Sequence, residues 1–121
     1  MRNVMGLLRV SLICLLLASG CGKPQGTVLG KAPKGEAHTI LSVHAGNTPP
    51  QVTLSGVMIE KCPTAGCWFR LQDGTGVIKV DTKSAGFVVV NVPLDTKVTV
   101  AGKLTTPDGH NVEIEATGIQ Y

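Results

Sequence analysis

Aromatic side chains are scarce in this chain, which has two Phe, one Tyr and one Trp among its 121 residues. This scarcity argues against binding of single-stranded nucleic acid, where successive bases stack on aromatic side chains. Patterns of common catalytic sites are also missing: there is no Ser-His-Asp order, no paired carboxylates and no phosphate loop that opens a helix. We therefore predict that the protein is not an enzyme.

Long apolar runs are missing as well. The apolar stretch at residues 10–18 is too short for a membrane-spanning helix, which needs about 20 apolar residues. It follows the positive charges of Arg2 and Arg9 and ends in the small residues Ala18-Ser19-Gly20. This pattern predicts a secretory signal peptide over residues 1–20.

The residues at the predicted cleavage site, "LLLASGC", resemble the lipobox of bacterial lipoproteins. The resemblance implies that Cys21 begins the mature chain, with its thiol diacylated and its amine acylated by chains such as palmitate. Ala18 departs from the lipobox pattern, in which leucine is commoner at that place. Gly22, not aspartate, follows Cys21, which implies a lipid anchor in the outer membrane facing the periplasm. The alternative is an ordinary signal peptide followed by a chance cysteine.

An excess of positive charge is missing from the predicted mature chain. The full chain carries 11 Lys+Arg against 8 Asp+Glu, and Arg2 and Arg9 are removed with the signal peptide. The remaining net charge is about +1, so the basic balance is mostly a targeting feature. A nucleic-acid partner is not expected on this ground either.

Residues 21–36 are rich in Gly, Pro and Lys and show hardly any periodicity, which predicts a flexible lipidated tether. We expect the folded domain at residues 37–121. Residues 37–50 could form a helical turn or a strand.

Five segments of the domain, at residues 52–61, 67–72, 77–81, 97–104 and 111–121, read as β-strands. Gly56 predicts a bulge or bend in the first strand, and Asp73–Gly76 a hairpin turn. Three strands in a meander, a longer connection and a hairpin predict an all-β, five-stranded OB-fold-like Greek-key barrel, partly open. A small β-sandwich is the alternative. The connection at residues 82–96 could be an extended loop or a short extra strand. The inward-facing residues are predicted to be Phe69, Leu71, Ile78, Val80, Val98, Val100 and Ile114.

The stretch "CPTAGCWF", the turn "DGTG" and a later Gly-Phe resemble a family of exported bacterial OB-fold domains of unknown function. The resemblance covers roughly residues 52–121 and implies a fold but no settled activity. The residues that carry it are Cys62, Gly66, Cys67, Trp68, Asp73, Gly74, Gly76, Gly86 and Phe87.

Cys62 and Cys67 flank a four-residue loop and are the two free cysteines expected after Cys14 is discarded and Cys21 is acylated. In such a hairpin loop the two positions face each other about 4.5–5.5 Å apart, close to the usual disulfide separation of about 5.5–6 Å. Because export favours oxidation, we predict a disulfide.

Two alternatives remain open for this cysteine pair. With His110 from the last turn as a third ligand, the thiolates could hold zinc, copper or a haem-type group. The thiols could also stay free, either inert or redox-active, although C-x₄-C lacks the C-x-x-C spacing and helix N-terminus that usually lower a thiol pKa. Otherwise no cofactor is expected.

Trp68, Arg70 and Lys79 are predicted to share the outer face of strands two and three, where OB-folds bind ligands. The alternative, which we prefer, is that Trp68 packs over the disulfide or under the Gly86-Phe87 loop. The sequence thus indicates a lipid-anchored cell-envelope domain that acts as a binding or structural module for an unknown ligand or protein. Handling of metal or haem, and oligonucleotide binding, are the alternatives.

Overall fold

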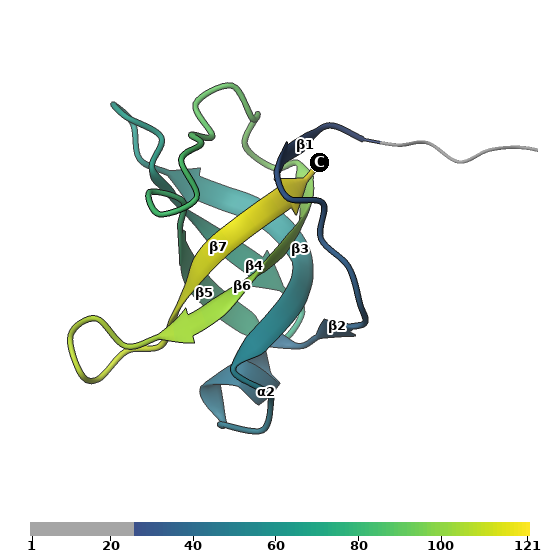
Figure 1. Cartoon of the computed structure of the whole chain (residues 1–121), viewed down its shortest axis with the longest axis vertical. Helices are drawn as coiled ribbons and strands as arrows, with labels where there is room; N and C mark the ends of the chain where they lie inside the picture. Colours follow the sequence, from purple (N-terminus) through teal and green to yellow (C-terminus); the bar gives the residue numbers. More distant parts are fainter. Residues whose placement is uncertain (1–25) are drawn as a thin grey trace, which may run out of the picture.

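The computed structural model describes residues 26–121, and the predicted signal peptide and Cys21 lie outside this range. Five long strands form a closed barrel in Figure 1. They are β3 (Gln51–Lys61), β4 (Trp68–Asp73), β5 (Gly76–Asp81), β6 (Lys97–Thr105) and β7 (Glu113–Gln120). Strands β3, β4 and β5 form an antiparallel meander, and β6 pairs with both β3 and β7. Two residue pairs of parallel β5–β7 ladder close the ring, so the predicted OB-fold-like barrel is confirmed.

The barrel interior is filled by one alternating face of each strand, because successive side chains of a strand point to opposite sides. All seven residues that the alternation predicted to face inward are at most 2% exposed. Met58, Leu71 and Ile78 lie side by side on β3, β4 and β5 in the middle of this core.

Strand β3 pairs with β6 along its first half and with β4 along its second, so it must curl around the barrel. Gly56 lies where the strand changes partner. A Cβ atom there would be 2.4 Å from the carbonyl oxygen of Gln72, and only glycine permits that approach. The predicted bend at Gly56 is therefore explained, and a bulge between Met58 and Glu60 adds to it.

One end of the barrel is closed by residues 37–44, which the sequence left unassigned. They form the two-residue strand β2 (Ala37–His38), parallel to β3, and the helix α2 (Ile40–His44). The side chains of Ile40 and Val43 are almost fully buried. The DGTG turn accepts hydrogen bonds from the first amides of α2. Ile40 N donates to Asp73 Oδ2 at 2.9 Å, and Leu41 N donates to Thr75 Oγ1 at 3.0 Å.

The other end is covered by the connection between β5 and β6. It consists of turns, with no helix or strand, so the extra strand is not formed. Val89 and Val92 are fully buried and plug the barrel. The Lys61 ammonium donates hydrogen bonds to the carbonyl oxygens of Val89, Val90 and Val92 and holds the plug in place.

Part of the predicted tether is structured. Strand β1 (Val28–Gly30) pairs antiparallel with β7, and Thr27 and Tyr121 exchange two backbone hydrogen bonds of 2.7 and 2.9 Å. Leu29 packs against the core. The tether prediction is thus wrong for residues 28–30, because pairing with β7 satisfies their backbone groups and gives Leu29 a buried contact. No helix among residues 26–121 is long and apolar enough to cross a membrane.

Asp73 joins the DGTG turn to α2, and this role can be tested. Its Oδ1 accepts hydrogen bonds from Thr75 N, Thr75 Oγ1 and Gly76 N at 2.7–3.0 Å. Partial burial alone would raise the pKa of this carboxyl, but the hydrogen bonds from Thr75, Ile40 and Gly76 together lower it. The ionised carboxylate therefore stabilises the fold at neutral pH.

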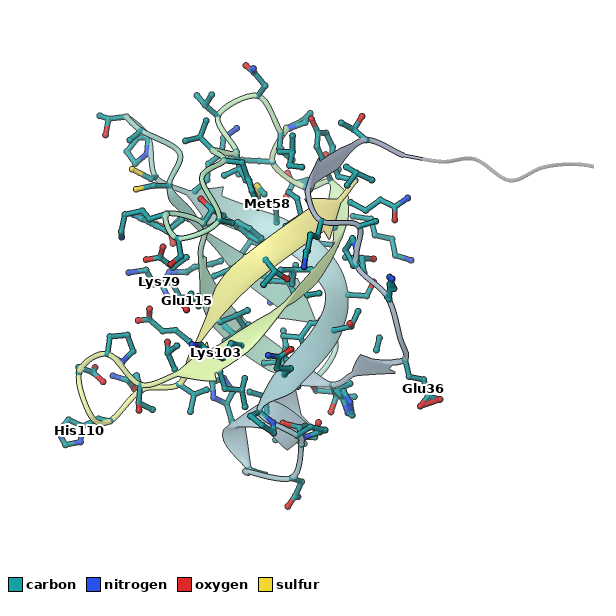
Figure 2. The ribbon with its side chains drawn as sticks, viewed as in Figure 1. Glu36, Met58, Lys79, Lys103, His110 and Glu115 are labelled. Carbon is teal, nitrogen blue, oxygen red and sulfur yellow. The ribbon has the colours of Figure 1, made fainter. Side chains whose placement is uncertain are left out.

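Asp73→Asn is expected to lower the free energy of unfolding by roughly 1–2 kcal/mol at pH 7, since it weakens bonds to a charged acceptor. A group with a depressed pKa stabilises the fold above its unfolded pKa, and this contribution is lost as the pH falls through its folded pKa. The difference from wild type should therefore shrink as urea denaturation is repeated from about pH 5 down to about pH 2. Glu36→Gln is the control, because Glu36 is exposed (Figure 2) and makes no side-chain hydrogen bond within residues 26–121. A pH-independent difference for Asp73→Asn would contradict the assigned role.

Candidate functional site

The outer face of β4 and β5 carries the three residues that the sequence proposed as a binding face. Arg70 is paired with Lys79 across the ladder, and Trp68 lies two residues before Arg70 on the same side of β4. Lys79 Nζ is 5.3 Å and Arg70 Cζ 5.8 Å from the centroid of the indole ring. Both distances are within the range of a cation–π contact, so the indole orders two cationic side chains on this face. We call these three residues the Trp68 face.

The two cations of the Trp68 face differ in their partners. Arg70 Nε donates to Glu60 Oε1 at 2.9 Å, in a pair that is about half exposed. Lys79 forms no ion pair with a carboxylate in the described part of the chain. Lys79 is therefore the cation that is available to an incoming acidic group.

A hollow of about 300 Å³ adjoins the Trp68 face, between β5, α2 and the connection from β6 to β7. His44 borders it, with Nε2 3.0 Å from the carbonyl oxygen of Val77. Asp108 orders the β6–β7 turn by accepting from the amides of His110 and Asn111. Together these hydrogen bonds lower the pKa of Asp108 to about 2, and the bond from the Asn111 amide makes the largest contribution. The lining includes His44, Arg70, Val77, Lys79, Asn111 and Glu113.

The packing alternative for Trp68 placed it over the disulfide or under the Gly86-Phe87 loop, and the structure bears on the second of these. Phe87 instead packs against the core beside β1: a Cβ atom on Gly30 would lie 2.9 Å from Phe87 Cε2. Trp68 is only partly buried. Its ring contacts the outer-face cations Arg70 and Lys79, so Trp68 lies on the outer surface of the barrel, where OB-folds bind ligands.

The loop from Cys62 to Cys67, hereafter the CPTAGC loop, has a different register from the one the sequence suggested. Before the bulge, β3 and β4 pair Val57 with Gln72 and Met58 with Leu71, and continuing that register would oppose the two cysteines. The bulge adds one residue to β3, so Cys62 N donates to the carbonyl of Trp68 at 3.1 Å. The expectation that the cysteines face each other is therefore wrong. Both are free thiols in the structure, and the disulfide stays a prediction.

Neighbouring backbone holds the CPTAGC loop. Thr82 N donates to Cys67 O at 2.9 Å, and Val89 N donates to Gly66 O at 2.8 Å. Gly66 has φ +63°, and a Cβ atom there would lie 2.7 Å from Val90 N. The glycine is thus required both by the turn and by the close approach of the barrel plug.

The CPTAGC loop also surrounds Cys62 with hydrogen-bond donors that the sequence did not reveal. The amide of Ala65, the hydroxyl of Thr64, and the amides of Thr64 and Gly66 lower the pKa of Cys62 to about 6. Cys62 Sγ lies 3.6 Å from Thr64 Oγ1. The spacing argument against a lowered thiol pKa is therefore wrong. The available signal was a cysteine directly before Pro in a tight turn, the place where a capping side chain faces free amides.

The metal site proposed as an alternative, with Cys62, Cys67 and His110 as ligands, is not formed in the described residues. Among residues 26–121 no three His, Cys, Asp or Glu side chains lie close enough to hold a metal ion. His110 sits at the tip of the β6–β7 turn and points away from the barrel (Figure 2). The expectation that the fold brings His110 to Cys62 and Cys67 is therefore wrong, because the extended β6–β7 turn carries it outward.

Comparisons with known proteins support the fold. No protein-family model matches the chain, and no curated protein matches it. Among solved structures it is similar to the hypothetical protein YgiW from E. coli, with a TM-score of 0.53 and 24% sequence identity. The match covers 74% of this chain and 92% of YgiW. The likeness shows a shared OB-fold-like barrel.

Proposed function

We propose that this protein is a lipid-anchored domain of the cell envelope that binds a ligand on its Trp68 face, at the outer membrane and facing the periplasm. The lipobox-like residues before Cys21 support the anchor, and the fold supports a binding role because OB-folds bind ligands on the matching strands. Membership of the exported OB-fold family is part of this proposal. It is supported by the roles of two signature residues, Gly66 in the CPTAGC loop and Asp73 in the DGTG turn.

The observation that carries the binding proposal is the ordered, unpaired cation on an indole ring beside a hollow. Lys79 is already held over Trp68, so little side-chain entropy is lost when it meets an anion. The hollow is lined mostly by polar side chains, among them His44 and Asn111, so it can accept the hydroxyl groups of a sugar ring in the same ligand. The face therefore suits a ligand that combines one acidic group with a ring, such as an acidic sugar of a glycan.

A long polyanion fits this face less well. Arg70 is neutralised by Glu60, and Glu113 adds negative charge to the hollow. An oligonucleotide needs a continuous basic track that neutralises several phosphates. The Trp68 face offers one free cation, so the oligonucleotide alternative is the weaker of the two.

Tryptophan fluorescence tests the proposal directly, because Trp68 is the only tryptophan in the chain. Purified protein is titrated with oligogalacturonate as the acidic glycan probe and with a thymidine oligonucleotide as the second arm. We expect the glycan to change the fluorescence with a salt dependence of about one released ion, and the oligonucleotide to bind weakly. Lys79→Ala should weaken glycan binding about tenfold, in line with the loss of one charged contact.

Lys97→Ala is the matched control, since it removes an exposed lysine at the start of β6 that lines a different hollow, which none of the three residues of the Trp68 face borders. It should bind the glycan as tightly as wild type does. A wild-type protein whose fluorescence does not respond to the glycan, or an equal loss in both variants, would contradict the proposed site. If the oligonucleotide binds more tightly than the glycan and with a steep salt dependence, the ligand of this face is nucleic acid instead.

A further inference from the structure

The CPTAGC loop places two thiols in unlike surroundings on a rigid support. Three backbone hydrogen bonds, from Cys62 N, Thr82 N and Val89 N, tie the loop to β4 and to the connection that follows β5. Both cysteines are partly exposed. A held, accessible pair of thiols is what thiol–disulfide exchange requires, because the attacking sulphur must reach an external disulfide.

Cys62 has the surroundings of an attacking thiol. Its sulphur lies 3.6 Å from the Thr64 hydroxyl oxygen, and hydrogen bonding by the amides of the turn at residues 64–66 lowers the pKa of the thiol. Consecutive backbone amides of this kind form a concave binding site for an anion, here the thiolate. Partial exposure leaves the sulphur open to a substrate.

The charged groups around the loop are otherwise paired. On β3, Glu60 pairs with Arg70 of β4, and the Lys61 ammonium is bonded to carbonyls of the barrel plug. Lys83, after β5, donates to Asp81 at 2.8 Å. The hydrogen bond and charge of Asp81, with a smaller contribution from Cys67, raise the pKa of Lys83.

We propose that the CPTAGC loop is a thiol–disulfide exchange site, in which Cys62 attacks a disulfide of another molecule and Cys67 resolves the intermediate. The Cys62 thiolate forms a bond to one substrate sulphur, and the other substrate sulphur leaves as a thiolate. Cys67 then gives its proton to solvent and attacks the Cys62 sulphur. The Cys62–Cys67 bond forms, the second substrate thiolate leaves, and two electrons have passed from the protein to the substrate disulfide.

The β3 bulge makes this pair suited to exchange. Because Cys62 lies opposite Trp68, a bond to Cys67 joins positions that are offset by one residue across the ladder and are not directly opposed. A disulfide closed against the preferred geometry is more easily reduced. The Cys62–Cys67 disulfide would therefore be reduced and re-formed during exchange, whereas a directly opposed pair would form a stable structural disulfide.

Substrates would meet an apolar rim beside the thiols. Val88 and Val90 are 49% and 47% exposed in the plug segment, and the backbone of Val90 touches Gly66. A disulfide in an apolar stretch of a protein fits this rim better than a free, strongly charged small disulfide does.

The test uses the full-length purified protein, reduced and then exposed to an unfolded, disulfide-containing protein substrate such as scrambled ribonuclease. Trypsin cleaves after Lys61 and Arg70, so one peptide, residues 62–70, carries both thiols and reports their state by mass. We expect the wild-type peptide to become an internal disulfide as substrate thiols appear, and Cys67→Ser to accumulate a mixed disulfide on Cys62. Cys62→Ser should react about two- to threefold more slowly than Cys67→Ser at pH 7, since the larger thiolate fraction of an acidic thiol outweighs its lower nucleophilicity.

Thr64→Val removes the hydroxyl beside Cys62 without removing a thiol, and it should slow the first attack and raise the pH midpoint of Cys62 alkylation above about 6. Thr106→Val, in the exposed β6–β7 turn, is the control and should match wild type. Equal rates for Cys62→Ser and Cys67→Ser would overturn the assigned roles. A native 62–70 peptide that stays oxidised in dithiothreitol while the protein remains folded would instead show a structural disulfide.

Discussion

Leu71→Asp is expected to leave the protein unfolded at 25 °C. Leu71 is fully buried and contacts Met58 on β3 and Ile78 on β5 at the centre of the barrel. Its replacement forfeits roughly 1.5–3 kcal/mol of apolar burial and adds several kcal/mol for an unpaired buried carboxylate. Since small domains have a total stability of roughly 5–15 kcal/mol, the sum is enough to remove most or all of it. Circular dichroism during thermal unfolding measures the effect.

The neighbouring residue provides the matched control for this prediction. Gln72 follows Leu71 on β4 but faces solvent, so Gln72→Asp introduces the same side chain on the other side of the strand. It should change the free energy of unfolding by less than about 1 kcal/mol. If Leu71→Asp unfolds with the same transition as wild type, the inward register of β4 is wrong.

Cys21→Ser is expected to abolish attachment of fatty acid and, with it, membrane anchorage. The proposed anchor depends on the thiol of Cys21, which a serine hydroxyl does not replace in the lipobox pattern. Each buried CH₂ contributes about 0.8 kcal/mol, so losing all acyl chains removes far more binding energy than any surface contact could restore. Cells are grown with radiolabelled palmitate, and the label is followed in the protein after detergent phase separation.

Cys14→Ser is the matched control, because it removes a cysteine from within the predicted signal peptide. It should keep the label and the detergent partitioning of wild type. A companion protein, with residues 1–20 replaced by a signal peptide of a soluble exported protein and with Cys21→Ser, should be released as soluble protein. Palmitate label on Cys21→Ser would refute the anchor.

Features that depend on neighbours in the chain were determined by the sequence alone. The alternation of Phe69 and Leu71 with Trp68 and Arg70 specifies the two faces of β4, since side chains of a strand alternate with a strict period of two. Asp73 opens a turn whose amides its own carboxylate can accept, and this is local chemistry too. These features were predicted correctly, together with the barrel order that follows from them.

Features that depend on distant partners were decided only by the tertiary structure. Residues 40–44 are helical because their first amides meet Asp73 and Thr75, more than 30 residues away. A five-residue segment has no stable helix of its own, so its pattern could not choose between helix and strand. Strand β1 similarly acquires its structure from β7, at the opposite end of the chain.

The candidate sites show the same division. Alternation placed Trp68 and Arg70 on one face, but the ladder with β5 was needed to set Lys79 over the indole ring. For the cysteines, loop length predicted an opposed pair, and one residue of bulge on β3 shifted Cys62 to face Trp68. A bulge arises where a strand must bend to serve two partners, so its position depends on the closed barrel and cannot be read from the six residues of the loop.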